Sequence, residues 1–332
     1  MSVADEAVGR RVLVTGATGF IGGHLVRRLV RRCARVVCLV RARSHRDRLA
    51  GLPVDLVFGD LDDDDALRTA VRGVSAVYHL AGLIKARRPE EFHRVNVAGT
   101  ARLLEACARS GDAPPRVVLV SSLAACGPST VDVPLTEDVP PRPLSAYGRS
   151  KLAAEREALA RADRLPIIVI RPPVVYGPGD RATLVFFRLA NLGLSLVGDV
   201  RLSLVHVDDL VRGLLLAGRT EAPTGRTYFV SGDERPTLQE LTRLIADGLG
   251  RRAVGVRIPY PVAHLAAQGV ELASGLAGRP AMFTTDKARD LYQSAWCCRS
   301  DRARRELGFA QQVTLEDGLH RTAHWYRRHG WL

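Results

Sequence analysis

One segment near the N-terminus, VLVTGATGFIGGHLVRRLV from Val12, constrains the fold more than any other part of the chain. It places three glycines, Gly16, Gly19 and Gly22, between a β-like run and a helix-like run. In a strand–turn–helix unit, such glycines permit the turn, let the backbone approach a pyrophosphate and let the helix pack closely. The helix N-terminus then presents N–H groups and the positive end of its dipole to the phosphates. The alternative is a tight connection that binds no ligand.

Six apolar runs show no alternation of polar and apolar residues; they begin at Arg11, Arg35, Val54, Val74, Arg116 and Pro166. Such runs are typical of parallel strands covered on both faces. Helical patterns lie between most of them, which predicts an α/β fold with a doubly wound parallel sheet, the Rossmann architecture. The glycine turn opens the first βαβ unit, so we predict that it binds a dinucleotide. Its candidate contacts are Gly16, Thr18, Gly19, Phe20, Ile21 and Gly22.

Beyond the sixth run the pattern changes to turns, short strands and helices. We predict an NAD(P)-binding domain over residues 1–175, joined by residues 203–222, and a smaller lobe over residues 176–332 that mainly binds the substrate. Three apolar residues of this lobe form either a pocket wall or a helix core: Phe186, Phe187 and Leu189. The segment PYPVAHLAAQGVELASGLAG from Pro259 predicts an amphipathic helix. Such a helix could cover the substrate site as a lid, form a dimer contact or touch a membrane surface. It lacks a basic polar face, which favours a lid or a packing element.

The formal net charge of +13 raises the question of nucleic-acid binding. Only three of the 48 basic residues are lysines, and the arginines are spread over the whole chain. A general bias toward arginine accounts for this distribution as well as a binding face would. We therefore expect no nucleic-acid partner, and we expect a small-molecule substrate or cofactor with anionic groups.

No apolar run approaches the roughly 20 residues of a membrane span, so we expect no stable membrane insertion. The first residues, MSVADEAVGRR, include acids and no long apolar core, so we expect no signal peptide. The six cysteines form no CxxC pair and no Cys/His cluster with zinc spacing. This pattern predicts reduced thiols, a cytoplasmic protein and no metal site.

The end of the second apolar run, LVRARSHR, indicates which cofactor is bound. An NAD site usually has an acid there for the ribose 2′-hydroxyl, and residues 36–46 contain none. Arg41 and Arg43 are suited to a 2′-phosphate, with Ser44 as a further donor. We therefore favour NADP(H) over NAD(H); the alternative is that these arginines are only solvated. Asp60–Leu61, after the third run, is a candidate adenine contact.

The segment AYGRSK contains the pair expected to do the chemistry. Tyr147 and Lys151 are four residues apart and so lie on one helix face. A nearby ammonium lowers the pKa of a tyrosine, which then exchanges a proton near neutral pH. Ser122 ends the fifth run, at the strand edge that faces the ligand crevice, and is expected to hold a substrate carbonyl. Ser121 is the competing candidate, and either serine is alternatively a hydrogen-bonded strand end.

The sequence resembles the extended short-chain dehydrogenase/reductases through a set of motifs in a fixed order. They are TGATGFIG, GDLDD, HLAG, NVAGT, SSLAACG, YGRSK, RPPVVYGPGD and VHVDDL. This superfamily includes the NAD-dependent epimerase/dehydratase family, dihydroflavonol-4-reductase-like enzymes and 3β-hydroxysteroid dehydrogenase-like enzymes. The resemblance runs from about Arg11 to the C-terminus. It is specific for the superfamily and poorly specific for the substrate.

The resemblance implies that Ser122, Tyr147 and Lys151 form the catalytic triad. It further implies cofactor contacts from Leu80, Ala81, Gly82, Asn96, Pro172 and Val175, with Asn96 supporting the active-site helix or a water. It also implies a homodimer built through helices near residues 90–110 and 146–162. The chain departs from the common pattern at two positions, because Cys126 replaces a tyrosine frequent in sugar-modifying members and Gly82 replaces a frequent alanine.

Three functions compete for this pattern. The first is an NADP(H)-dependent oxidoreductase that reduces a carbonyl, or oxidises a secondary alcohol, of an apolar small molecule, with Tyr147 as acid and base. The second is a nucleotide-sugar epimerase or dehydratase with tightly bound NAD; the missing acid after the second run and Leu123, where a dehydratase would carry a carboxylate, argue against it. The third is a non-catalytic NADP(H)-binding sensor or scaffold, which has little use for all three catalytic residues.

Overall fold

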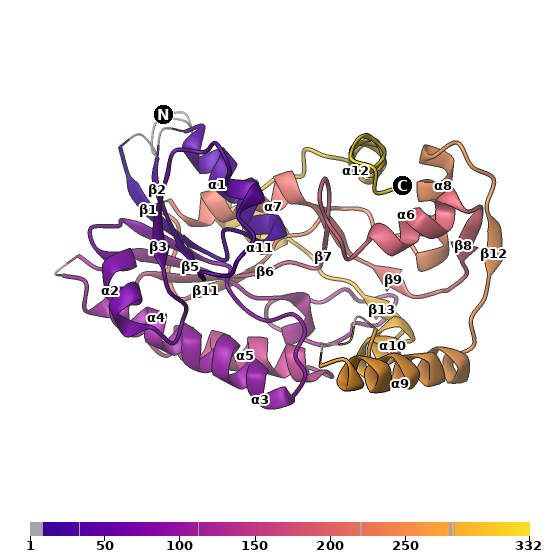
Figure 1. Ribbon diagram of the computed structural model, residues 1–332, viewed down its shortest axis with the longest axis horizontal. Coiled ribbons are helices and arrows are strands. Elements are labelled where there is room, and N and C mark those ends of the chain that lie inside the picture. Colours follow the sequence, from indigo (N-terminus) through magenta and orange to yellow (C-terminus); the bar gives the residue numbers. More distant parts are fainter. Residues whose placement is uncertain (1–8, 33, 112, 220, 279–280, 282) are drawn as a thin grey trace.

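The computed structural model describes residues 9–32, 34–111, 113–219, 221–278, 281 and 283–332. Residues 1–8, where we expect no signal peptide, lie outside this described part. The main sheet has seven parallel strands in the order β11-β6-β5-β4-β1-β2-β3 (Figure 1). They are β1 (Arg11–Thr15), β2 (Arg35–Val40), β3 (Val54–Phe58), β4 (Ala76–His79), β5 (Arg116–Val120), β6 (Ile167–Arg171) and β11 (Arg226–Phe229). The predicted doubly wound sheet is confirmed.

The strand order reverses between β1 and β4, which places a ligand crevice at the carboxyl ends of these strands. Thr15, the last residue of β1, lies opposite Leu39 of β2 and His79 of β4. The glycine turn, the end of β2 and the end of β4 therefore meet at one edge of the sheet.

Alternate residues of each strand enter two separate cores, because successive side chains of a strand point to opposite faces. Val12 and Val14 pack with α1, α7 and α11 on one face, and Leu13 packs with α2, α4 and α5 on the other. The first layer comprises α1 (Phe20–Val30), α7 (Val207–Ala217) and α11 (Asp301–Leu307). The second comprises α2 (Asp64–Val71), α4 (Gly99–Ala108) and α5 (Ala146–Leu159). A short helix, α3 (Pro89–Phe92), continues through a π-helical segment, His93–Ala98, into α4.

The expectation that all six apolar runs are covered on both faces is wrong for β3. This strand forms an edge of the sheet, where it pairs only with β2. Its Leu56 and Phe58 side chains are exposed, Phe58 to 52%. An edge strand receives less cover than a central one, and the composition of the run does not reveal its position in the sheet.

The C-terminal half contributes to both parts of the molecule. β11 and α11 belong to the main sheet and its helix layer, although residues 176–332 were expected mainly to form the substrate lobe. The lobe itself is built on α6 (Leu184–Asn191), α8 (Leu238–Gly248) and α12 (Leu315–Arg328). Short parallel pairs join β7 (Val174–Tyr176) to β10 (Leu204–His206), β8 (Leu194–Leu196) to β12 (Val254–Val256), and β9 (Arg201–Leu202) to β13 (Ala295–Trp296).

Of the three apolar residues predicted to form either a pocket wall or a helix core, Phe187 is settled by its burial, whereas Phe186 and Leu189 are half-buried. Phe187 is fully buried and packs edge-on against Tyr326 of α12, with ring centroids 5.0 Å apart. Phe187 is therefore helix core and does not line a pocket.

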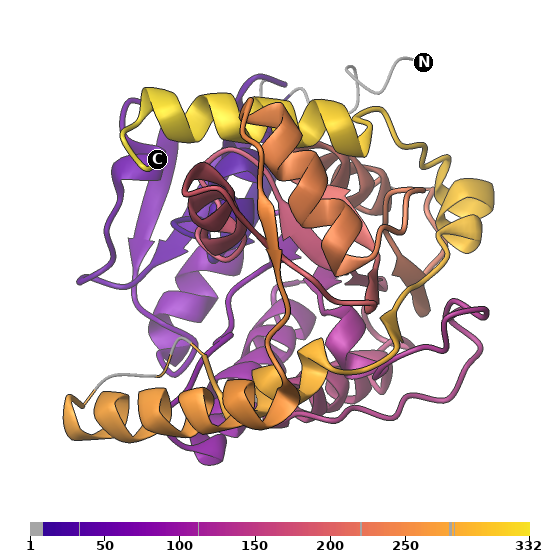
Figure 2. The ribbon, with the colours of Figure 1, turned by 90° about the vertical axis from the view of Figure 1, so that its right-hand side faces the viewer.

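The predicted helix after Pro259 is α9 (Tyr260–Leu276), followed by α10 (Thr285–Leu291). Figures 1 and 2 show α9 lying along the outside of the molecule. Only Ala263 and Ala267 of its residues are buried, so the expectation of a packing element is wrong for its larger apolar side chains. No helix in the described ranges is both long and apolar enough to cross a membrane.

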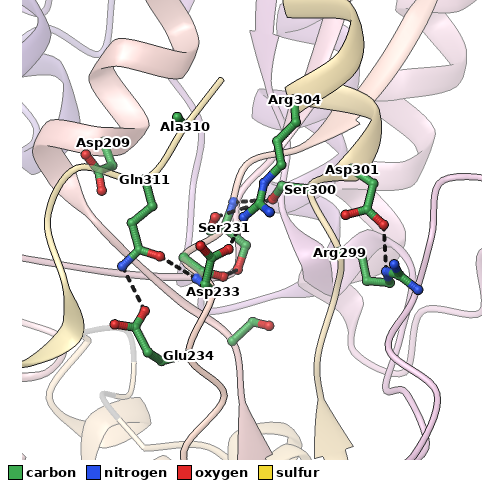
Figure 3. Close-up of polar contacts among 12 residues, drawn as sticks. Asp209, Ser231, Asp233, Glu234, Arg299, Ser300, Asp301, Arg304, Ala310 and Gln311 are labelled. Carbon is green, nitrogen blue, oxygen red and sulfur yellow. Dashed lines mark hydrogen bonds and ion pairs between the residues drawn. The ribbon is translucent and has the colours of Figure 1, made fainter. Parts of the chain in front are cut away.

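A polar network joins the loop after β11 to the segment that enters α12 (Figure 3). Gln311 accepts a hydrogen bond from the backbone of Asp233 at 2.5 Å and donates to Glu234 at 2.7 Å. Glu234 accepts in turn from the backbone N–H of Leu315 at 2.9 Å, and Arg304 of α11 forms an ion pair with Asp233. These contacts tie the lobe to the main sheet.

Candidate active site

The glycine turn packs tightly against the end of β4. Gly16 has a φ of +71°, a left-handed conformation that favours glycine. A Cβ on Gly16 would lie 2.7 Å from the backbone nitrogen of Ala81, and one on Gly22 would lie 2.2 Å from the carbonyl oxygen of Gly16. Gly19 precedes α1, whose first turn carries no acidic residue, so its N–H groups suit a phosphate. This cradle fits the pyrophosphate of a dinucleotide.

The remaining residues of the turn connect it to the substrate lobe. Thr18 is half-buried in the turn, and Phe20 and Ile21 begin α1 and pack against the core. The Arg48 guanidinium lies 6.0 Å from the Phe20 ring centroid and donates a hydrogen bond to the carbonyl of Gly179 at 2.6 Å. Sequence reasoning did not identify Arg48, because its partner lies 131 residues away.

A buried histidine fixes the floor of the crevice. His79 Nδ1 lies 2.6 Å from Thr15 Oγ1, and His79 Nε2 lies 2.9 Å from Thr100 Oγ1. Thr15 Oγ1 also accepts the backbone N–H of Ala81 at 3.1 Å, and the Thr15 carbonyl accepts that of Leu80 at 3.2 Å. Burial lowers the pKa of His79 to about 3, so its ring is neutral at physiological pH. Leu80 and Ala81 are thereby held beside the glycine turn.

A cavity of about 680 Å³ opens at the carboxyl ends of β2 and β3. Its lining includes four predicted cofactor residues, Arg41, Arg43, Ser44 and Asp60, together with Ala42, Phe58, Gly59 and Asp63. The fifth residue predicted for this region, Leu61, is buried against Gly99 and does not face the cavity. The lining thus combines two arginines from the end of β2 with two carboxylates, Asp60 and Asp63, from the segment after β3.

Phe58 and Arg46 are further residues of this region that sequence reasoning missed. The Arg46 guanidinium carbon lies 5.4 Å from the Phe58 ring centroid. Such a pair offers a planar, partly apolar surface beside Arg41 and Arg43. The apolar run from Val54 predicts a buried strand that includes Phe58. The position of this aromatic residue at the strand end, just before Gly59, is the signal in the sequence that it lines a crevice.

The three predicted catalytic residues meet at the end of β5 and the start of α5. The Ser122 side chain caps a 3₁₀ turn at Leu123–Ala125, where its Oγ accepts the N–H of Ala124 at 3.1 Å, and it hydrogen-bonds to Tyr147. Lys151 is buried one helical turn beyond Tyr147, and its Nζ donates to the carbonyl of Val120 at 2.6 Å. The structure thus brings a serine, a tyrosine and a lysine together beside the cofactor crevice.

The pKa of Tyr147 differs from the expectation. Burial raises this pKa above its ordinary value of 10.0, and the hydrogen bond with Ser122 only partly opposes the rise. Lys151 does not lower it in this structure, because its ammonium points to the backbone of β5. Burial also lowers the pKa of Lys151, to about 8. Tyr147 therefore holds its proton firmly at neutral pH.

Ser121 and Ser122 are distinguished by their surroundings. Ser121 is buried, and its hydroxyl has no hydrogen-bond partner among the described residues. Ser122 is half-buried and contacts Tyr147. The geometry favours Ser122 as the residue that meets a substrate oxygen.

Residues 12–231 match the family described as NAD dependent epimerase/dehydratase. The chain belongs to this family. The resemblance to the extended short-chain dehydrogenase/reductases is thereby confirmed, and the chain is an NAD(P)-dependent oxidoreductase of that superfamily.

Two relatives and one solved structure illustrate the range of this family. The ceramide reductase of Caulobacter vibrioides (strain NA1000 / CB15N) is 37% identical over 326 residues, which cover 97% of this chain and 96% of that protein. The 4-hydroxy-2-methyl-3-oxo-4-farnesyl-3,4-dihydroquinoline-1-oxide ketoreductase of Stigmatella aurantiaca is 31% identical over 323 residues, or 93% and 94% of the two chains. MoeE5, solved in complex with UDP-glucose and NAD, is 30% identical with a TM-score of 0.76 and covers 96% of this chain and 99% of its own.

In this family member, Asn96 ties the loop after β4 to the catalytic helix. It lies in the π-helical segment, where its Nδ2 donates to the carbonyl of Leu83 at 3.0 Å and to Ser150 Oγ at 2.9 Å, and its Oδ1 accepts the Leu83 N–H at 2.7 Å. A Cβ on Gly82 would lie 3.0 Å from Asn96 Oδ1 and 4.0 Å from Lys151 Nζ. The glycine in place of the frequent alanine therefore leaves more room beside Lys151.

Pro172 directly follows β6, and Val175 lies in β7. The Pro172 carbonyl accepts the N–H of Leu123 at 2.8 Å, which joins the end of β6 to the turn that carries Ser122. Val175 is half-buried in β7, where it pairs with Val205 of β10. Their assignment as neighbours of the nicotinamide stays a prediction.

Behind the catalytic residues lies a buried ion pair that sequence reasoning missed. Glu155 accepts two hydrogen bonds from Arg171, at 2.9 Å from Nε and 2.6 Å from Nη2, and the two side chains are only 1% and 6% exposed. Glu155 also opposes the fall in the pKa of Lys151, one helical turn away. Glu155 thus acts on the ammonium by its charge, whereas the carbonyl of Val120 holds the ammonium in place.

A second cavity, of about 630 Å³, opens between the loop after β11 and the end of β13. Its three arginines already have partners in the chain. Arg201 donates to the carbonyl of Arg235, Arg235 donates to the carbonyl of Cys298, and Arg299 pairs with Asp301 at 2.7 Å. Figure 3 shows this last pair beside the polar network that joins the lobe to the sheet. These contacts engage the three arginines within the chain, which indicates a structural role rather than ligand binding.

Gly148 sets the distance between Tyr147 and Ser122. A Cβ at this position would lie 2.3 Å from the carbonyl oxygen of Ala124, so the start of α5 approaches the 3₁₀ turn as only glycine allows. We expect Gly148→Ala to displace Tyr147 and to lower kcat by about a hundredfold, as small misplacements of catalytic groups do. Steady-state kinetics check this. The control is Gly275→Ala, whose Cβ meets nothing within 4 Å, and equal activity of the two variants would contradict the prediction.

Proposed function

We propose that the chain is an NADP(H)-dependent reductase of a carbonyl group on an apolar small molecule. The proposal rests chiefly on the cavity at the ends of β2 and β3, which presents Arg41 and Arg43 and no acid in the position that an NAD ribose would use. The set of Ser122, Tyr147 and Lys151, at the end of β5 and the start of α5, suits acid catalysis at a carbonyl oxygen. Two relatives whose names give reductase activities on lipid-like molecules support the substrate class.

The residues of the chain divide the chemistry of reduction among them. The nicotinamide cofactor, when bound, supplies the hydride that adds to the carbonyl carbon. Tyr147, which keeps its proton because burial raises its pKa, donates that proton to the carbonyl oxygen as its double bond is broken. Ser122 donates a hydrogen bond to the same oxygen and stabilises its developing negative charge. A proton from solvent then restores Tyr147, while Lys151 stays one helical turn away with its ammonium held by the carbonyl of Val120.

Cofactor choice is tested by calorimetric titration of NADPH and NADH. We expect Arg41→Ala to weaken NADPH binding roughly 10- to 100-fold, since it removes a charge-assisted hydrogen bond to the 2′-phosphate, and to leave NADH binding unchanged. The matched control is Arg35→Ala, an exposed arginine at the opposite end of β2. Equal loss for both cofactors would contradict the assignment of Arg41 to the 2′-phosphate.

Substrate class is tested by NADPH oxidation with ketones carried on long acyl or isoprenoid chains. Turnover of these ketones, with no turnover of UDP-glucose, would support the proposal. NAD released only on denaturation of the purified protein, together with epimerisation of a nucleotide sugar, would overturn it in favour of the epimerase alternative. The structural likeness to MoeE5 makes this comparison necessary.

A further inference from the structure

Helix α9 presents an uncharged apolar face to the outside of the molecule. Four large apolar side chains are spaced by three, seven and four residues, a spacing that places them on one side of a helix. They are Val262, Leu265, Leu272 and Leu276, exposed to 56%, 70%, 69% and 84%. The stripe they form is about 20 Å long, and monomeric proteins rarely expose a contiguous apolar surface without using it. These four residues are termed the α9 face below.

Charged side chains of both signs flank the α9 face, and none lies on it. Glu271, the only charged residue in α9, is turned inward, where it accepts hydrogen bonds from the backbone N–H and hydroxyl of Thr285. Asp286 and Asp290 of α10 are half-buried as well. Arg257 and Arg289, in contrast, are exposed on either side of α9 in the sequence. Each of these arginines has an acid beside it, since Arg257 pairs at 3.5 Å with the exposed Asp199 and Arg289 pairs at 3.9 Å with Asp286. The α9 face itself carries no charged side chain.

We propose that the α9 face docks on the surface of an anionic lipid bilayer. A helix that buries an apolar face among lipid headgroups, with cations beside it, binds by burial of area and by attraction to anionic lipids. The formal net charge of +13 attracts such a surface. Figure 2 shows α9 lying along the outside of the molecule, and the helical spacing of the four exposed side chains places them on one side of that helix.

The α9 face belongs to a hairpin of α9 and α10 that contacts the start of the catalytic helix. Asp286, at the start of α10, accepts the backbone N–H of Ala146 at 3.3 Å, so the hairpin of α9 and α10 contacts the residue before Tyr147. A bilayer at the α9 face would therefore lie beside the catalytic helix. An apolar ketone could then reach the site from the lipid phase; this last step rests on the proposed function, whereas the docking itself does not.

The test is co-sedimentation of the full chain with vesicles of phosphatidylcholine, with and without phosphatidylglycerol. We expect the wild type to partition onto the anionic vesicles and to be released at high salt. The double variant L265S/L272S is expected to partition at least tenfold less, because each leucine contributes apolar area to the bound state. The matched control is Leu192→Ser, which removes a leucine exposed to 75% at the end of α6 and should partition as the wild type does.

Several results would overturn the docking. These are a wild type that stays in solution with anionic vesicles, or a double variant that partitions as the wild type does. A third is a wild type that does not sediment but whose dimer, measured by light scattering, becomes a monomer in L265S/L272S; the face would then join two copies. Calorimetric NADPH titration and thermal unfolding without vesicles are run alongside. They show whether the variants are folded, and they separate a failure of the proposed reductase from a failure of docking.

Discussion

Replacing Tyr147 with phenylalanine is expected to lower kcat for carbonyl reduction by a factor of about 10² to 10⁴. The substitution removes the hydroxyl that donates the proton and keeps the ring, which packs 6.0 Å from Phe92. Binding of NADPH is expected to stay within about threefold of the wild type, because the phosphate cradle and the arginine cavity lie on other elements. Single-turnover kinetics and calorimetry on the same preparation separate the two effects.

Ser122→Ala serves as the comparison for this variant. It removes one hydrogen bond to the substrate oxygen, for which a loss of roughly 10² to 10³ is typical. The double variant should lose far less than the product of the two effects, since both residues act on one oxygen. A Tyr147→Phe enzyme with wild-type kcat would rule out this tyrosine as the acid. The proposed reaction would then be wrong, even with Ser122 intact.

The second large effect concerns stability. Glu155→Gln is expected to lower the free energy of unfolding by about 3–5 kcal/mol, because it leaves the Arg171 guanidinium buried without its counter-charge. Urea denaturation measures the change. The pH profile of reduction provides a second readout. Because Glu155 raises the pKa of Lys151, Glu155→Gln should lower that pKa, so that Lys151 loses its proton at a lower pH than in the wild type.

The same helix offers a matched control for this prediction. Glu157 pairs with Arg161 at 2.7 Å, but the side chains are 40% and 21% exposed, so Glu157→Gln should cost no more than about 1 kcal/mol. Replacing both members of the buried pair, as E155Q/R171M, should recover much of the lost stability, because no charge then remains buried alone. If the double variant is no more stable than E155Q, the unpaired guanidinium is not the cause.

The features predicted correctly from the sequence depend on neighbours in the chain. The glycine turn, the six strands and the spacing of Tyr147 and Lys151 are local patterns, and a strand or a helix face follows from a few consecutive residues. The cavity lined by Arg41 and Arg43 follows from one further rule, that parallel strands end at a common edge. The Ser122–Tyr147 contact was predicted from the family resemblance and from the same rule.

The features that were missed depend on distant parts of the chain or on burial. The pairing of Glu155 with Arg171 and the contact of Arg48 with Gly179 join residues that no sequence spacing connects. The rise in the pKa of Tyr147 depends on how deeply the folded chain buries its hydroxyl, whereas the spacing to Lys151 predicted the opposite direction. Composition also could not show that the apolar side of α9 faces outward, because a helix pattern gives the face and not its partner.

The place of β11 in the main sheet has a consequence for how the chain matures. β6 lies between β5 and β11, and β11 ends only at Phe229 of the 332 residues. A chain leaving the ribosome with its first 175 residues would therefore carry β6 as an open, strongly apolar edge, which invites pairing with another nascent chain. Residues 1–175 alone therefore do not contain the complete sheet. Fragments and fusions need to extend past residue 229, and molecular chaperones have a defined window in which to act.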